Sequence, residues 1–344
     1  MQSDILLRAL ELANEGISVV PVATDGSKRP GLSSWKEYQG RRPRTDELMT
    51  WFSNAQGVGV ICGAVSGNLE LLELEGRAVA DKLHIELKEL AQAAGLGDVW
   101  QRLNEGYVEM TPSGGLHWLY RIDGVVPGNT KLARRPGEGD RIDVLAETRG
   151  EGGFVIVAPT NGTCHPSGGA WTQLSGGPKS IPTLTVAERQ ELHSLFATFD
   201  TVPKTEFISE ELVSKGGALT PGSDYEARVT WEQILEPLGW KKIRLDSQGV
   251  TTWCRPGKDF GISATTNHGG TDKFYVFSTS TIFEAERSYS KFAVYTIVEH
   301  GGNFSEAARA LRAKGYGEPP KELGSLEVHS PSLVQLHNEQ GEVI

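Results

Sequence analysis

The first half of the chain alternates between segments with helical periodicity and short apolar runs. Residues 3–14 carry apolar side chains at helical spacing, with Ser3 placed to cap the helix and Gly16 to end it. A second helix is predicted over 77–94, before Gly95. Strands are predicted at 17–22, 57–62, 69–75, 107–111, 116–122, 141–147 and 153–159. Helices interleaved with both adjacent and separated strands predict an α+β or α/β domain.

The pattern divides the chain into two units. At roughly 150 residues per domain, a length of 344 residues suggests about two domains. A capping box from Thr185 to Glu188 begins a helix that reaches Phe199, and a stretch without periodicity follows it. The predicted organisation is a first domain over 1–200, a linker over 201–222, a small, mainly helical domain over 223–317, and a flexible tail or linker over 318–344.

Composition excludes several classes of protein. Hydrophobic residues make up 38% of the chain and charged residues 23%, so a core can form and global disorder is excluded. No apolar run approaches the roughly 20 residues that span a bilayer, and the N-terminal amphipathic helix is too acidic for a signal peptide. Three distant cysteines form no C-x-x-C pair, which favours a reducing cytoplasm: Cys62, Cys164 and Cys254.

Charge is distributed unevenly along the chain. The net charge of −10 argues against a generally basic coat for nucleic acid, although a local footprint depends on distribution. Residues 25–44 hold six basic and two acidic residues, and residues 241–258 hold five and one, so each stretch has a local charge of +4. Ordinary solvated surface is the alternative interpretation of both stretches.

Two glutamates flank a leucine in the predicted strand 69–75. Because residues i and i+2 of a strand face the same way, Glu73 and Glu75 lie side by side on one face. Adjacent carboxylates repel each other unless a cation lies between them, and Mg²⁺ and Mn²⁺ prefer oxygen ligands. The pair therefore indicates a divalent metal site, with the solvated face of a half-buried strand as the alternative.

A glycine pair joins the next two predicted strands. In the motif T-P-S-G-G-L-H, the backbone amides of Gly114 and Gly115 can approach an anion closely, and Ser113 adds a hydroxyl donor. His117, two residues into the following strand, can donate to a phosphate oxygen. The alternative is a plain hairpin turn with His117 satisfied inside the sheet.

A third acidic position lies in the predicted strand 141–147. The neighbours of Asp143 face the opposite side of the strand, so its carboxylate is a candidate third metal ligand. Glu147 is an alternative on the same face. A partly exposed strand residue without a role in chemistry remains the other interpretation of either acid.

Taken in order, these motifs resemble the primase-polymerase (Prim-Pol) family of the archaeo-eukaryotic primase superfamily, in the form found in phage and plasmid replication proteins. The series is a carboxylate pair, S-G-G-x-H, and a single acid before G-G-F-V-I-V-A-P. An early K-x-P…W pattern (Lys28, Pro30, Trp35) and G-V-G-V-x-x-G-x-x-S-G at 57–67 also match. The resemblance implies an RRM-like α+β catalytic domain of the archaeo-eukaryotic primase type within residues 1–200.

The resemblance also implies roles for individual residues. Its catalytic positions correspond to Glu73, Glu75, Asp143 and His117, of which the three acids would bind two divalent ions, Mg²⁺ or Mn²⁺. This chain departs from the family in having glutamate rather than aspartate first in the acidic pair. The residues implied to contact the nucleotide are Ser113, Gly114, Gly115, His117, Arg149 and Lys28.

The implied activity is nucleotidyl transfer by a template-dependent DNA primase and DNA polymerase. Its partners would be a single-stranded DNA template, a primer, and dNTPs, rNTPs or both. A membrane is not expected among its partners. The second unit resembles the small helical module that follows Prim-Pol domains in phage proteins, often before a helicase. No G-x-x-x-x-G-K-[ST] motif is present, so a P-loop ATPase is not indicated. The resemblance and the acidic tail without periodicity instead imply the N-terminal part of a longer primase–helicase, in the host cytoplasm if phage-encoded.

Two other functions fit the same residues. A metal-dependent nuclease would use the same carboxylates, whereas a non-enzymatic initiator or single-strand-binding module would keep them for structure and stack bases on tryptophans. The tryptophans near basic residues are Trp35, Trp51, Trp118 and Trp253, with core packing as their alternative role. In the second unit, the residues expected to hold template during primer synthesis are Lys241, Lys242, Arg244, Arg255, Lys258, Trp240 and Trp253.

Overall fold

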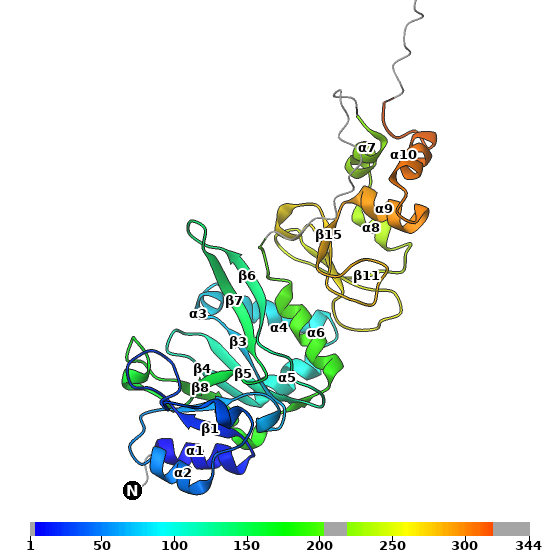
Figure 1. Ribbon diagram of the computed structural model, residues 1–344. Coiled ribbons are helices and arrows are strands. Elements are labelled where there is room, and N and C mark those ends of the chain that lie inside the picture. The colour runs from blue at the N-terminus through cyan, green and yellow to red at the C-terminus, as the bar shows by residue number, and fades with distance from the viewer. Residues whose placement is uncertain (1–3, 203–218, 319–344) are drawn as a thin grey trace, which may run out of the picture.

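The computed structural model describes residues 4–202 and 219–318, which form two units packed against each other (Figure 1). The first unit contains two β-sheets and the second contains a third. Helices and strands occur together in both, so the architecture is mixed α+β, as the sequence pattern predicts. Most of the predicted linker and almost all of the predicted tail lie outside the described residues.

A seven-stranded sheet forms the centre of the first unit. Its strand order is β6-β7-β3-β5-β4-β9, with β10 parallel to the end of β5 and every other neighbouring pair antiparallel. Because β3 lies in the middle of the sheet, five of its six residues are buried. The strands are β3 (Leu69–Leu74), β4 (Tyr107–Met110), β5 (Leu116–Ile122), β6 (Thr130–Pro136), β7 (Ile142–Arg149), β9 (Thr172–Ser175) and β10 (Thr183–Leu184).

Each face of this sheet is covered by its own core. Leu72 and Leu74 of β3 pack with Trp118 of β5 against helices on one face. Leu69 and Leu71 pack into a second core on the other face. Strand alternation therefore places Glu73 on the same face as Leu71, away from the helices.

The helical face is covered by α3 (Gly76–Ala80), α4 (Leu83–Ala93), α5 (Gly97–Glu105) and α6 (Val186–Ala197). The opposite face carries a three-stranded antiparallel sheet in the order β1-β2-β8, with two helices outside it (Figure 1). These elements are β1 (Ser18–Pro21), β2 (Val58–Ile61), β8 (Phe154–Val157), α1 (Asp4–Asn14) and α2 (Thr45–Trp51). The second layer is open over part of the central sheet, where the pocket described below lies.

Several elements differ from the sequence-based expectation. The helix predicted over 77–94 is broken between α3 and α4, because Lys82 adopts a left-handed backbone conformation with φ 65°. Strand β6 lies in the segment 123–140, for which no strand is predicted, because two bulges in its pairing with β7 break the alternation that would mark it. Helix α5 and strand β9 likewise lie in segments for which neither a helix nor a strand is predicted.

The second unit contains a five-stranded antiparallel sheet in simple sequential order, with helices before and after it. Helix α7 begins at Pro221, inside the predicted linker, because Thr220 caps it through the Ser223 amide. More residues lie in helices than in strands. The elements are α7 (Pro221–Arg228), α8 (Trp231–Leu235), β11 (Lys241–Leu245), β12 (Thr251–Cys254), β13 (Ala264–Thr266), β14 (Phe274–Val276), β15 (Arg287–Tyr289), α9 (Lys291–His300) and α10 (Phe304–Ala313).

The tryptophans proposed as base-stacking platforms are largely core residues. Trp118 is 1% exposed in the helical core, and Trp253 is 0% exposed in the core of the second unit, where Trp240 is also buried. Base stacking by these three side chains is therefore a wrong expectation, because all three are packed inside the cores of the two units. Trp35 and Trp51 are half-buried and pack beside Phe154 and Tyr38.

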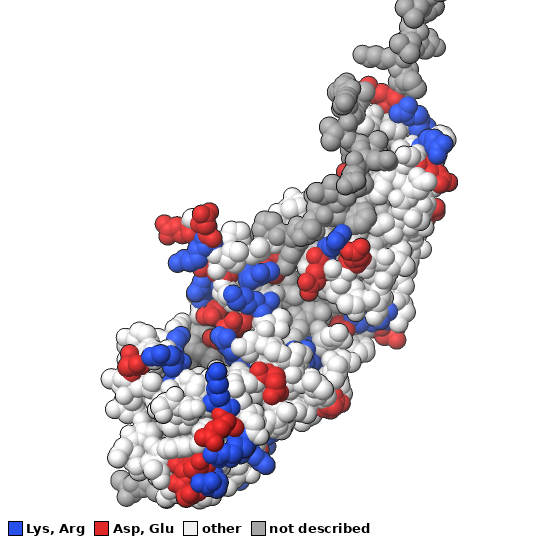
Figure 2. Space-filling view, in the orientation of Figure 1, with Lys and Arg blue, Asp and Glu red and all other residues white. Residues whose placement is uncertain are grey.

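Both basic stretches of the sequence form ion pairs within the chain. Within 25–44, three arginines pair with nearby acids, and Figure 2 shows basic and acidic side chains adjoining one another. Within 241–258, two lysines pair inside the second unit and two other cations pair with the first unit. These pairs are Lys241–Asp259, Lys242–Glu232, Arg244–Glu89 and Lys258–Glu191. Contact of residues 241–258 with template stays a prediction. The structure shows instead that four of their cations form ion pairs within the protein.

The contact between the units is built on α4 and α6. The amide of Gly261 donates to the carbonyl oxygen of Ala94 at 2.7 Å, and Ile262 is buried in the helical core of the first unit. Lys258 and Glu191 pair with only 15% and 13% of their side chains exposed. The second unit is thus docked on the helical face of the central sheet, on the side opposite the pocket.

Reversing one charge at this contact is expected to loosen the docking. Lys258→Glu places two carboxylates together at a largely buried position, and loss of such a pair costs about 3 kcal/mol or more. Hydrogen exchange of the amides at 258–262 should then become roughly a hundredfold faster. Lys241→Glu is the control, because its partner Asp259 belongs to the same unit and is 95% exposed. Equal exchange in both variants would contradict a charge-stabilised interface.

Candidate active site

A pocket lies between the open part of the central sheet and the strand β8. One wall carries acidic and polar side chains of the sheet, and the other carries Phe154 and Ile156 of β8 with Trp171. The residues predicted from sequence that line it are Lys28, Glu73, Glu75, Ser113, His117 and Arg149. The structure therefore brings together side chains from four separate parts of the first unit.

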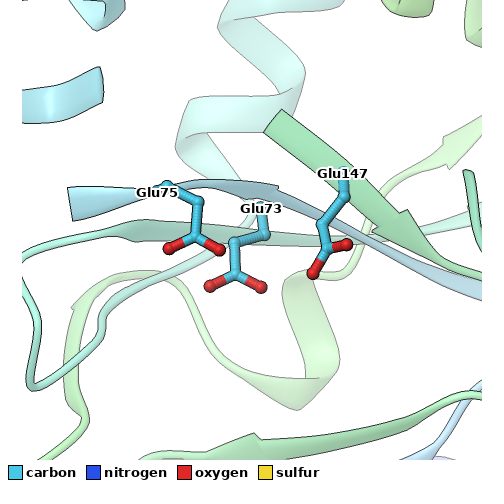
Figure 3. A group of neighbouring side chains, drawn as sticks. All are labelled: Glu73, Glu75 and Glu147. Carbon is cyan, nitrogen blue, oxygen red and sulfur yellow. The ribbon is translucent and has the colours of Figure 1, made fainter. Parts of the chain in front are cut away.

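Three carboxylates converge in this pocket. Glu73 and Glu75 follow each other on one face at the end of β3, as alternation predicts, and Glu147 of β7 is the register partner of Glu73. One carboxylate oxygen from each of the three lies within 4.8 Å of the others (Figure 3). The side chains of Glu73 and Glu147 are only 18% and 12% exposed. Such a group of oxygen ligands suits a hard divalent cation.

Asp143 does not belong to this cluster, which corrects the sequence-based assignment of the third acid. It lies four residues before Glu147 on β7, roughly 13 Å away along an extended strand. The Asp143 carboxylate instead forms ion pairs with Arg77 at 2.6 Å and with Arg141 at 3.1 Å. The pairing register of β7 with β3 places Glu147 opposite Glu73, whereas Asp143 lies beyond the residues of β7 that pair with β3. A bulge at Leu145 also interrupts the alternation of β7 between the two acids.

The electrostatics of the cluster favour a bound cation. Burial raises the pKa of Glu75, and the charge on Glu73 raises it further. Burial also raises the pKa of Glu147, where Arg149 opposes the shift and Glu73 adds to it. For Glu73, burial alone would raise the pKa, but the charge and hydrogen bond of His117 lower it overall. Two of the three acids thus lack full compensation for their charge, which a divalent ion would supply.

His117 lies beside the acids with both ring nitrogens directed at carboxylates. Its Nε2 is 3.4 Å from Glu73 Oε1, and its Nδ1 is 2.8 Å from Glu109 Oε1. Burial by itself lowers the pKa of His117. The charge of Glu73 and the hydrogen bonds to Glu109 and Glu73 outweigh burial and raise the pKa to about 10. A protonated His117 can donate a hydrogen bond from Nε2 toward a ligand in the pocket.

The glycine turn is a tight hairpin packed against the end of β3. Thr111 closes it through its hydroxyl, which accepts from the Gly115 amide at 3.0 Å, and Gly114 takes a left-handed conformation with φ 79°. A side chain at Gly76 would place its Cβ 1.9 Å from the carbonyl oxygen of Ser113, so only glycine permits this approach. The turn is thereby fixed next to the carboxylate pair, with Ser113 exposed at the pocket.

The two other predicted phosphate contacts take different positions. Arg149 lies on β7 and pairs with Glu147, so its guanidinium is held at the acidic cluster. Lys28 is exposed at the pocket, on a loop where its backbone is left-handed with φ 55°. Arg149 and Lys28 bring positive charge to the pocket beside the acids.

Sequence reasoning missed two histidine-related features of the pocket. Glu109 is buried against His117, lies in the predicted strand 107–111 and shares a strand face with Tyr107. Pairing the strands 107–111 and 116–122 as a hairpin through the glycine turn would have placed Glu109 opposite His117. His165 lies 3.4 Å from the Ser113 hydroxyl and packs edge-on against Trp171. Its segment had only the composition of a surface loop, so no local signal marked it.

The chain matches one protein family over the region that builds this pocket. Residues 9–189 match Prim-Pol, the N-terminal domain of bifunctional DNA primase/polymerase, and this is more than half of the chain. The chain therefore belongs to the Prim-Pol family, which confirms the resemblance noted in its sequence. No curated protein matches the chain.

Family membership gives the site a coarse chemical meaning. The family comprises DNA primases and polymerases that depend on metal ions and act on DNA and nucleotides. The acidic cluster of the pocket is a group that can hold such an ion. Across residues 4–202 and 219–318, the structure contains no helix with the length and apolar character needed to cross a membrane.

Proposed function

We propose that the chain is a template-dependent DNA primase and DNA polymerase that transfers nucleotides with the help of two divalent ions, Mg²⁺ or Mn²⁺. The observation that carries the proposal is the convergence of Glu73, Glu75 and Glu147 beside His117 and the glycine turn. Acids suited to metal ions and donors suited to phosphates occupy neighbouring walls of one pocket. This is the arrangement that transfer of a nucleotide from its triphosphate requires.

The proposed roles follow from the charge and position of each side chain. Glu73, Glu75 and Glu147 act as metal ligands rather than as bases, with Glu147 in the place first given to Asp143. Bound divalent ions would lower the pKa of the attacking hydroxyl and stabilise the charge of the departing pyrophosphate. His117 donates from Nε2 to a phosphate oxygen, and Ser113 adds a hydroxyl donor from the turn. Gly114 and Gly115 let the backbone approach the phosphates.

Arg149 and Lys28 complete the proposed triphosphate site. The Arg149 guanidinium is already held at Glu147, so it can bridge the acidic cluster and a phosphate. Lys28 lies at the open side of the pocket and brings a point charge to the outer phosphates. Phe154 and Trp171 on the opposite wall give the nucleoside an apolar surface.

The proposal extends to the organisation of the protein. The first unit would carry the chemistry and the docked second unit would support primer initiation, within a phage or plasmid replication protein that also contains a helicase. The support is the resemblance of the second unit to the module that follows Prim-Pol domains, together with its packing on the catalytic unit.

The test is a primer-extension assay with labelled dNTPs on a primed DNA template. The protein should extend the primer with Mn²⁺ or Mg²⁺ and stop when EDTA is added. Primer synthesis on single-stranded DNA, with rNTPs and dNTPs supplied separately, tests the primase activity. Shortening of the DNA would identify a nuclease instead, and DNA binding without extension would identify a single-strand-binding module.

Loss of the His117 side chain is expected to weaken nucleotide use more than DNA binding. His117→Ala removes a charge-assisted donor worth about 1.5–3 kcal/mol, so KM for dNTP should rise roughly ten- to over a hundredfold. Affinity for primed template should stay within about twofold, because His117 is buried at the bottom of the pocket. Steady-state kinetics and template titration measure the two effects. A fall in template affinity with unchanged KM would contradict the assignment.

A further inference from the structure

Glu109 is a buried carboxylate beside the pocket that has no part in the mechanism above. It lies on β4, is 0% exposed, and is the register partner of His117 across the hairpin that carries the glycine turn. A fully buried carboxylate is costly unless hydrogen-bond donors surround it. The hydrogen-bond donors around Glu109 therefore indicate what its carboxylate does in the structure.

Both oxygens of Glu109 are occupied. Oε2 accepts a hydrogen bond from the backbone amide of Ala158 at 2.8 Å and another from the Tyr107 hydroxyl at 3.1 Å. Oε1 lies 2.8 Å from Nδ1 of His117. Ala158 is the residue after β8, so a backbone amide holds Oε2 in place without the help of the Tyr107 hydroxyl. The remaining oxygen is thereby directed at the imidazole ring.

This contact determines which nitrogen of His117 faces the pocket. Because a carboxylate only accepts, Nδ1 must carry the proton in the bond to Glu109, and Nε2 is left on the side of Glu73. A half-turn of the ring would remove Nδ1 from Glu109 and leave the buried charge with one donor fewer. The geometry is that of a partner that orients a functional histidine through its other ring nitrogen.

We propose that Glu109 is a positioning residue for nucleotide binding, which holds His117 with Nε2 directed at the triphosphate of the incoming nucleotide. The proposal rests on the proposed function, because it specifies how the same pocket recognises a nucleoside triphosphate. Glu109 itself touches no substrate and acts through His117.

Glu109→Gln tests this positioning role without changing the volume of the side chain. Glutamine has the same shape, but one of its terminal atoms is an amide nitrogen that only donates. The Ala158 amide requires an acceptor, so the glutamine carbonyl should turn to Ala158 and present its NH₂ group to His117 Nδ1. KM for dNTP should then rise roughly tenfold, with kcat and template affinity changed by less than about twofold. The expected ¹⁵N NMR result is loss of the proton from Nδ1 of His117.

A double-mutant cycle shows whether Glu109 acts through His117. In a His117→Ala background, Glu109→Gln should raise KM no further, because the side chain that it orients is absent. Tyr107→Phe is the matched control: it removes the other side-chain contact to Glu109 and leaves the bond to His117, so KM should stay within about twofold. An equal rise in KM in both backgrounds, or an equal rise with Tyr107→Phe, would show that Glu109 serves only the fold and would overturn the proposal.

The role of Glu109 and the proposed function of the protein can fail independently, and different measurements test them. If wild-type protein fails to extend primers, the proposed function fails, whereas Glu109 is still tested by dNTP binding measured at equilibrium and by the Nδ1 signal of His117. Wild-type activity with unchanged KM and an unchanged Nδ1 signal in Glu109→Gln would reject the role of Glu109 alone.

Discussion

Glu147→Gln is expected to reduce primer extension by about a hundred- to a thousandfold, whereas Asp143→Asn should leave it within about twofold. Glu147 faces Glu73 across β3 and β7 and shares the acidic cluster with Glu75. Asp143 is held by Arg77 and Arg141 outside the cluster. The glutamine keeps the shape of the side chain but removes the charge that a metal ion needs. Primer extension by both variants, at equal protein and Mn²⁺ concentrations, measures the effect.

A second measurement makes this comparison independent of catalysis. Ligand binding to the folded state stabilises it, by about 2.7 kcal/mol at a hundredfold excess over Kd. Mn²⁺ should therefore raise the melting temperature of the wild type and of Asp143→Asn, but not that of Glu147→Gln. Without metal, Glu147→Gln should melt at or above the wild-type temperature, because it relieves repulsion from Glu73. Loss of activity in Asp143→Asn with retention in Glu147→Gln would restore the first assignment.

Glu70→Ala is expected to lower the free energy of unfolding by about 3–5 kcal/mol. Glu70 is 0% exposed on the helical side of β3, where Arg189 donates to both of its oxygens at 2.6 and 2.7 Å. The Tyr120 hydroxyl donates to it as well, at 2.6 Å, and is itself 2.9 Å from His193 Nε2. Removing the carboxylate leaves a partly buried guanidinium without its counter-charge beside the helical core.

Urea denaturation followed by circular dichroism measures this loss. Glu284→Ala is the control, because the exposed pair of Glu284 with Arg287 contributes at most about 1 kcal/mol. A loss of similar size in both variants would contradict the distinction between buried and exposed pairs. Glu70 lies outside the pocket, so folded protein of the Glu70 variant should retain primer extension.

Local sequence patterns were sufficient to predict much of the first unit. Alternation along 69–75 predicted that Glu73 and Glu75 share a face, and they do. The S-G-G motif predicted a turn before His117, because glycine is needed for the left-handed conformation at Gly114. The order of these motifs also indicated the Prim-Pol family, which the family match confirms.

The role of aromatic and basic residues could not be derived in the same way. Trp253 and the lysines around it look alike in sequence whether they meet DNA or protein. In the structure Trp253 is buried in the core of the second unit, and Lys258 is paired with Glu191 of the first. Burial depends on which surfaces pack against each other in the folded chain, and the composition of a segment does not show this.

Three features could be predicted from the sequence alone: the family, the paired acids on one strand face, and the turn before His117. Two others required the folded chain, namely that Glu147 rather than Asp143 completes the acidic cluster, and that Glu109 contacts His117. The physical reason is the same for both. A strand's two-residue period is local and shows which face a side chain takes, whereas the register between strands is set by distant segments and shows which side chains meet.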